Sequence, residues 1–79
     1  MRHIKQKGEK FSIKEAVKLT GAKDHNIVNW RYKYKDRFSG FIHLNRHDLD
    51  LISKINQLVN IDGYQLWKAM EIIDNENTH

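Results

Sequence analysis

Residues 24 to 35 (DHNIVNWRYKYK) gather polar, aromatic and basic side chains whose chemistry is suited to holding another molecule. If this segment is helical, the 3.6-residue period divides it into two faces. One face carries Ile27, Trp30, Arg31 and Tyr34, and the other carries His25, Asn29, Tyr32 and Lys33. Amides read base edges in the DNA major groove and ammonium groups neutralise phosphates. The second face therefore has the composition of a recognition helix.

The face geometry assigns an expected role to these side chains and to the basic residues near them. Base edges are expected to be read by His25, Asn26 and Asn29. Phosphates are expected to be contacted by Lys23, Tyr32, Lys33, Lys35 and Arg37. Trp30 lies on the other face beside Ile27, so we expect it to pack in the core.

The five histidines are the other candidates for a reactive site. His43 and His47 are four residues apart, as in a helical metal-binding pair, but Asn45 between them resembles a helix cap and would separate them onto different elements. The chain has no cysteine, and it contains no glycine-rich phosphate loop, nucleophile elbow or glutamate–histidine metal motif. We therefore expect no catalytic residues, no metal and no cofactor, and the protein is not expected to be an enzyme.

The net charge of +4 is distributed unevenly along the chain. Residues 1 to 37 carry 11 Lys and Arg against 4 Asp and Glu, a net charge of +7, whereas residues 38 to 79 carry 3 against 6, a net charge of −3. The positive half contains the expected recognition helix, and a field of this sign attracts polyanions such as DNA. A solvated lysine-rich surface would have the same composition, so charge alone leaves both readings open.

The length of 79 residues indicates a single domain, and 39% hydrophobic residues can form a small core. Residues 1 to 10 are basic with few apolar side chains, which predicts a flexible arm. Residues 11 to 74 would form the domain, followed by a polar tail at residues 75 to 79. No window approaches the ~20 apolar residues of a membrane span, and the lack of cysteine is compatible with the cytoplasm.

The segment from Ser12 to Gly21 has the pattern of a short helix. Ser12 and Glu15 form a capping box, apolar residues follow at helical spacing, and Gly21 suits the C-terminal cap. A turn at residues 21 to 23 leads to Asp24, whose carboxylate is expected to cap the next helix. Two helices joined by a short glycine-containing turn constitute a helix-turn-helix.

The pattern changes after residue 36. Phe38 and residues 41 to 44 read as two short strands around a turn at residues 39 and 40, which predicts a β-hairpin wing. Asn45 is expected to cap a third helix, with Asp48 in its first turn. The stripe expected to be buried in this helix consists of Leu49, Ile52, Ile55, Leu58 and Val59.

A fourth, shorter helix is expected after Asp62 and Gln65, which repeat the capping-box spacing. Its apolar residues are Leu66, Ala69, Met70 and Ile73. Trp67 lies one position from this stripe; it either completes the core or, together with Met70, forms a protein contact surface. The fold class expected from the whole chain is mainly α: a winged helix-turn-helix of four short helices with a two-stranded β-hairpin wing.

This order of elements resembles the MerR-type (mercury-resistance-regulator) winged helix-turn-helix. FSIKEAVKLTGA is similar to the family's opening helix, DHNIVNW to its recognition helix, GFIHLNRHDLDLI to its wing strand and third helix, and IDGYQLWKAMEII to its fourth helix. The match covers about residues 11 to 73, and its most specific points are Ser12, Ile13, Leu19, Thr20, Gly21, Gly40, Asp48, Leu49 and Gly63. The Asn29-Trp30 pair also resembles the Arg-Trp pair of related excisionases and chromosome- or plasmid-segregation proteins.

The resemblance implies sequence-specific binding of double-stranded DNA, with the helix from His25 onward in the major groove and the hairpin at residues 37 to 44 on the flanking backbone. The chain departs from the family at Val28, Asn29 and Ile42, where Arg, Tyr and Arg are usual. The family's long dimerisation helix and effector domain have no counterpart in this sequence, so no small-molecule effector is expected.

A small transcriptional regulator is the first expectation for the biological role, and an architectural factor, such as an excisionase or a segregation protein, is the alternative. A regulator would have a palindromic operator, whereas an architectural factor would have clustered or repeated sites. A protein-interaction module that uses the Trp67 and Met70 face is a third class. We expect a homodimer or a cooperative multimer on DNA, no membrane partner, and a cytoplasmic location associated with the nucleoid.

Overall fold

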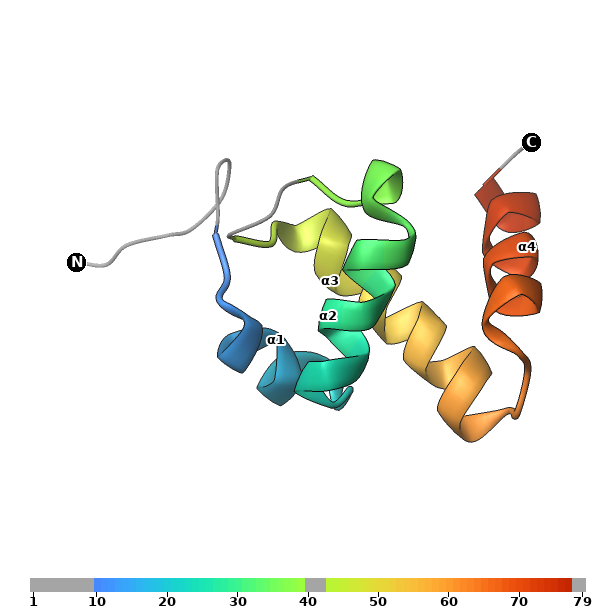
Figure 1. The fold of residues 1–79 in the computed structure, drawn as a ribbon, viewed down its shortest axis with the longest axis horizontal. Coiled ribbons are helices and arrows are strands. Elements are labelled where there is room, and N and C mark those ends of the chain that lie inside the picture. Colours follow the sequence, from blue (N-terminus) through green and yellow to red (C-terminus); the bar gives the residue numbers. More distant parts are fainter. Residues whose placement is uncertain (1–9, 40–42, 78–79) are drawn as a thin grey trace.

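The computed structural model describes residues 10 to 39 and 43 to 77. Its elements are α1 (Ile13–Thr20), α2 (Asp24–Lys33), the 3-10 turn η1 (Lys35–Arg37), α3 (Arg46–Asn56), the π-helical turn η2 (Gln57–Ile61) and α4 (Leu66–Asn77). Figure 1 shows α3 and η2 as one continuous rod, with α1 and α2 near its beginning and α4 turning back from its end. The expected four helices are therefore present. The arm expected at residues 1 to 10 lies outside the described residues, apart from Lys10.

The α1 helix begins and ends where its sequence predicts. The Ser12 hydroxyl accepts a hydrogen bond from the Glu15 backbone N–H at 3.1 Å, and the Glu15 carboxylate accepts one from the Ser12 N–H at 2.8 Å. At the other end, Gly21 has a φ of 81°, a left-handed conformation that glycine adopts without a steric penalty. Its N–H donates to the Val17 carbonyl at 2.9 Å. Local chemistry therefore fixes both ends of this helix.

The α2 helix starts one residue earlier than predicted. Lys23 occupies the extended N-cap position, and its side chain makes no capping hydrogen bond. Asp24 is already the first helical residue, so its carboxylate cannot reach back as a cap, and the prediction of an Asp24 cap was wrong. Asp24 still complements the positive end of the helix dipole.

The predicted β-hairpin wing was wrong: residues 10 to 39 and 43 to 77 contain no β-strand, only one isolated antiparallel bridge between Phe11 and Leu44. Both backbone hydrogen bonds of Leu44 go to Phe11, at 2.7 and 2.9 Å, so Leu44 is paired with the segment before α1 and not with a hairpin partner. Residues 35 to 37 form the η1 turn, and Phe38 is buried in the core. Phe41 and Ile42, which the hairpin also required, lie outside the described residues.

The start of α3 is held by a buried carboxylate. Asn45 caps α3 as predicted, and Asp48 makes this cap reciprocal, with both side chain to backbone bonds at 2.9 Å. Asp48 is fully buried, and it also accepts hydrogen bonds from the backbone N–H and the hydroxyl of Ser39. A buried carboxylate is tolerated when donors satisfy it, and here those donors join the chain after η1 to the start of α3.

The α4 helix also differs from its prediction at both ends. It begins at Leu66, whereas Asp62 follows η2 and its carboxylate accepts a bond from the Gln57 amide at 3.3 Å. The predicted capping box between Asp62 and Gln65 was therefore wrong, because Asp62 closes the preceding turn. At its other end α4 continues to Asn77, so the first residues of the expected polar tail are helical.

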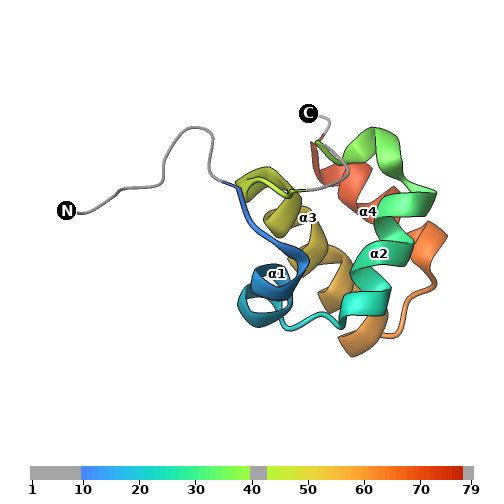
Figure 2. The ribbon, with the colours of Figure 1, turned by 60° about the vertical axis from the view of Figure 1, so that its left-hand side comes forward.

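One apolar core joins all four helices. It consists of Phe11, Ala16, Ala22, Ile27, Trp30, Phe38, Leu44, Leu49, Leu51, Ile52, Ile55, Met70 and Ile73. The predicted α3 stripe is buried at Leu49, Ile52 and Ile55 and half-buried at Leu58 and Val59. Figure 2 shows α1 and α2 flanking α3. No helix in the described part of the chain is long and apolar enough to cross a lipid bilayer.

Candidate nucleic-acid interface

The two faces predicted for α2 are present in the structure. Ile27 is fully buried and Trp30 is 3% exposed, which confirms that Trp30 packs in the core. The opposite face is in contact with solvent along its length and comprises His25, Asn29, Tyr32 and Lys33, all exposed. Because the inward residues anchor the helix, the outward side chains are carried on a fixed support.

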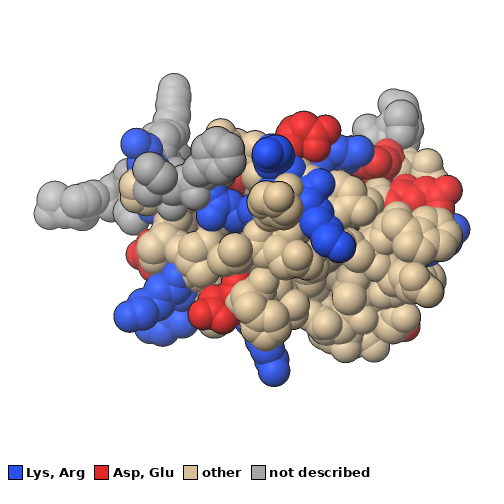
Figure 3. All heavy atoms as spheres, viewed as in Figure 1, with Lys and Arg blue, Asp and Glu red and all other residues tan. Residues whose placement is uncertain are grey.

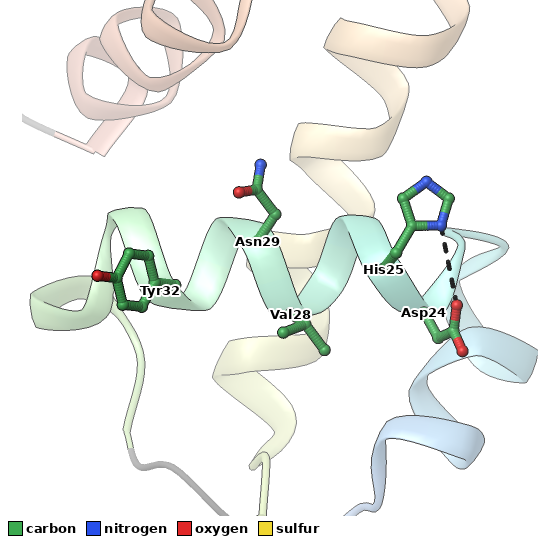
Figure 4. A pocket seen from close by; sticks show the side chains of 5 residues that line it. All are labelled: Asp24, His25, Val28, Asn29 and Tyr32. Carbon is green, nitrogen blue, oxygen red and sulfur yellow. Dashed lines mark ion pairs between the residues drawn. The ribbon is translucent and has the colours of Figure 1, made fainter.

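The outward side of α2 carries a shallow hollow of about 490 Å³, lined by Asp24, His25, Val28, Asn29 and Tyr32. Figure 4 shows His25 and Asn29 projecting along one edge of the helix, with Val28 and Tyr32 on the adjoining surface. The Asp24 carboxylate lies 3.9 Å from Nδ1 of His25. Hydrogen-bonding groups therefore stand on the rim of a hollow whose surface is mainly carbon.

Two of the three predicted base-reading residues lie on this hollow. His25 and Asn29 line it, whereas Asn26 is half-buried and does not. Val28 was not among the predicted base-reading residues, but it lines the hollow and is 53% exposed. The signal was present in the spacing, because Val28 lies four residues from both Asp24 and Tyr32 and so shares their row on the helix.

The lysines assigned to phosphates lie at the two ends of α2. Lys23, Lys33 and Lys35 are exposed. Lys23 stands at the helix start beside a second hollow of about 560 Å³ between α1 and α2, which Lys14 also lines. The Lys35 ammonium lies 5.7 Å from the centroid of the Tyr32 ring, within the range of a cation–π contact. This contact places the Lys35 ammonium next to the Tyr32 ring at the C-terminal end of α2.

Arg37 differs from the other residues assigned to phosphates because a carboxylate already holds it. Its guanidinium donates to both oxygens of Asp74 on α4, with the Nη2 to Oδ2 distance at 2.7 Å. The hydrogen bond with Asp74 raises the pKa of Arg37 and lowers the pKa of Asp74. Arg37 thus ties η1 to α4.

The contact surface considered for α4 needs correction. Met70 is 4% exposed and belongs to the core, so it cannot form part of a surface. Trp67 is 61% exposed, and the large apolar side chains of Ile61 and Tyr64 are also exposed in the turn before α4. Figure 3 shows few charged atoms over the lower right of the molecule, where η2 and the start of α4 lie. The exposed apolar side chains of this corner are therefore Ile61, Tyr64 and Trp67.

The histidines do not converge. His43 precedes the Asn45 cap and His47 lies in the first turn of α3, so the cap separates them as expected. Among residues 10 to 39 and 43 to 77, no group of three His, Cys, Asp or Glu side chains is placed to hold a metal ion.

The α2 face can donate and accept hydrogen bonds at several points along about ten residues of helix, with cations at both ends. Such a surface suits non-covalent recognition of a long, polar, negatively charged molecule. Comparisons of the chain with family models, with curated proteins and with solved structures gave no match.

Proposed function

We propose that the protein binds double-stranded DNA by laying the outward face of α2 in the major groove, without performing chemistry on it. The observation that carries this proposal is the separation of α2 into a buried apolar side and an exposed side bearing His25, Asn29 and Tyr32. The major groove of B-DNA is about 12 Å wide and admits an α-helix, whose outward polar side chains then meet the base edges.

The distribution of cations supports the same proposal. Lys23 precedes α2, and Lys33 and Lys35 follow at its end, so a helix in the groove would bring positive charge toward the phosphate strand on either side. Neutralising phosphates releases condensed counterions, which supplies most of the sequence-independent affinity for DNA. Arg37 is not included among these contacts because it is bonded to Asp74.

The connection between α1 and α2 is compatible with a helix-turn-helix. The left-handed Gly21 turns the chain sharply, and Ala22 is buried between the two helices and the core. In such units the first helix crosses the DNA backbone while the second enters the groove. The resemblance of residues 11 to 30 to MerR-type domains supports this arrangement, and the proposal requires no wing.

A small transcriptional regulator is the role we favour, with an architectural factor such as an excisionase or a segregation protein as the alternative. Helix-turn-helix proteins commonly bind two half-sites one helical turn apart, so we expect cooperative binding of two or more copies. A palindromic site favours the regulator, whereas clustered direct repeats favour the architectural factor. Either role implies association with the nucleoid in the cytoplasm.

A salt titration tests DNA binding. The affinity for any duplex should fall linearly on a log–log plot, and Lys33→Gln should reduce the slope by about one unit, because one phosphate contact is lost. Lys68→Gln is the matched control, since Lys68 is paired with Glu71 on α4 and should leave the slope unchanged. Fluorescence anisotropy from about 50 to 200 mM salt provides the measurement. Affinity that does not change with salt would contradict the proposal.

A protein-interaction module is the second candidate, and one observation favours it. Ile61, Tyr64 and Trp67 are exposed in one short stretch of chain, and aromatic residues are enriched in protein interfaces. The same titration separates the two candidates, because a module of this class would not bind duplex DNA even at low salt.

A further inference from the structure

Val28 is an exposed apolar residue in the middle of an otherwise polar surface. It is 53% exposed, it lines the hollow on α2, and it is not part of the core cluster. A β-branched residue also has lower helix propensity than the straight-chain residues that usually cover an exposed helical surface. Neither core packing nor helix stability therefore accounts for a valine at this place.

The neighbours of Val28 restrict what could face it. Asp24 lies one turn earlier on the same row, and its exposed carboxylate would be repelled by a phosphate. His25 and Asn29 project from the adjoining edge of the helix and line the same hollow with groups that hydrogen-bond to base edges (Figure 4). The surface around this hollow is therefore better suited to face the base edges on the floor of the major groove than to face the sugar–phosphate backbone.

The spacing of these residues matches that of stacked base pairs. Residues four apart in a helix, such as His25 and Asn29, are separated by about 6 Å along its axis. Two base-pair steps span about 6.8 Å. Val28 and Asn29 are about 1.5 Å apart along the axis and about 100° apart around it. When the surface between them faces the floor of the groove, they would address the same base pair or two neighbouring pairs. In the major groove, A·T pairs present adenine N6 and N7 together with the thymine 5-methyl group.

We propose, on the basis of the DNA-binding function above, that α2 recognises an A·T-containing half-site through this adjacent pair of residues. The Asn29 amide holds the N6 and N7 edge of an adenine, and the Val28 methyl groups pack on the 5-methyl group of a thymine in the same or the next base pair. Val28 is thus a specificity-determining residue.

Base analogues test the proposal without altering the protein. A preferred duplex is selected from a random-sequence library with the full chain, and each thymine in it is replaced in turn by uracil, which lacks only the methyl group. At one position, uracil should weaken binding about fourfold, the effect of one buried methyl group. Replacing the partner or neighbouring adenine by 7-deazaadenine should weaken binding about tenfold, because N7 is lost.

Variants assign each effect to its residue. Val28→Ala should bind the thymine and uracil duplexes equally, while its affinity should still depend on adenine N7. Asn29→Ala should bind the adenine and 7-deazaadenine duplexes equally, while its affinity should still depend on the thymine methyl group. Leu19→Ala is the matched control, because Leu19 is 60% exposed on α1 and does not line the hollow. This control should retain both dependences. Circular dichroism should show that all three variants are folded, since each altered side chain is exposed.

Several results would overturn the inference. They are the absence of any preferred sequence, indifference of the wild type to uracil at every thymine, or a uracil effect that persists in Val28→Ala. In each of these cases salt-dependent binding to random duplex would remain, and the proposed function would stand. Failure of the wild type to bind any duplex at low salt would overturn both proposals together.

Discussion

The basic residues of the two halves of this protein are used differently. In the part from residue 43 to 77, the Lys54 ammonium lies 2.9 Å from Glu76, Lys68 lies 3.1 Å from Glu71, and the Arg46 guanidinium lies over the ring of Phe11. In the part from residue 10 to 39, exposed lysines form no ion pair with another described residue. These lysines are Lys10, Lys14, Lys18, Lys23, Lys33 and Lys35, of which Lys35 lies over the ring of Tyr32.

This difference indicates which cations can act on a partner. A lysine beside a carboxylate has its field largely cancelled within the molecule, whereas an exposed lysine without one projects its field into solvent. The first half of the protein therefore has a surface available to a polyanion, whereas the basic residues of the second half make contacts within the molecule. Arg37 is an exception, because it belongs to the first half and is bonded to Asp74 in the second.

The largest expected effect comes from the inward side of α2. Trp30→Ala should reduce the free energy of unfolding by about 3 to 5 kcal/mol, because a large buried side chain leaves a cavity. Trp67→Ala is the matched control; since Trp67 is 61% exposed, its loss should change stability by only about 0.5 kcal/mol. Urea denaturation followed by circular dichroism measures both.

The comparison between the two sides of α2 depends on this result. If Trp30→Ala stayed folded with normal stability but no longer bound DNA, the inward and outward faces would have been assigned in reverse. A large destabilisation in Trp67→Ala would instead show that the start of α4 supports the fold more than its exposure indicates.

Features set by residues close in sequence were predictable. The Asn45 cap depends on groups three residues apart, and the left-handed Gly21 depends on its own lack of a side chain. The exposed side of α2 follows from helical periodicity once Ile27 and Trp30 are assigned to the core. In each case the determining interaction lies within about one turn of helix.

Features set by distant residues were not predictable. The wing was predicted from local alternation, but Leu44 pairs with Phe11, which lies far earlier in the chain. Ser39 donates both its backbone N–H and its hydroxyl to the buried Asp48. Met70 was considered for a surface, but the packing of α4 against α3 turns it into the core. Tertiary contacts override local pattern at these sites.

An intermediate effect is expected on the outward side of α2. Asn29→Ala should lose about 1 to 3 kcal/mol of binding free energy on a preferred duplex and little on random DNA, because an amide bidentate to adenine discriminates between bases whereas phosphate contacts do not. Asn75→Ala replaces an exposed amide on α4 and should leave both affinities unchanged. Competition anisotropy with the two duplexes measures the difference. Equal losses on both would mean that Asn29 does not read bases.

The smallest expected effect concerns Asp74, the carboxylate that joins the two halves. Its pKa is lowered in the folded protein by the hydrogen bond from Arg37, so its contribution to stability is present above the pKa of an unfolded aspartate and is lost as the pH falls through the lower, folded value. Both side chains of the pair are partly exposed, so solvent screening limits this contribution to at most about 1 kcal/mol. Asp74→Asn should therefore lower the free energy of unfolding by that amount at about pH 6, and the difference from the wild type should shrink as the pH falls below the pKa of an unfolded aspartate. Asp36→Asn is the control, because Asp36 is more exposed and its oxygen lies 4.0 Å from Nε of Arg37, so its removal should cost less. Urea denaturation across this pH range measures both variants, and a difference that grew on acidification would mean that Asp74 does not stabilise the fold through its charge.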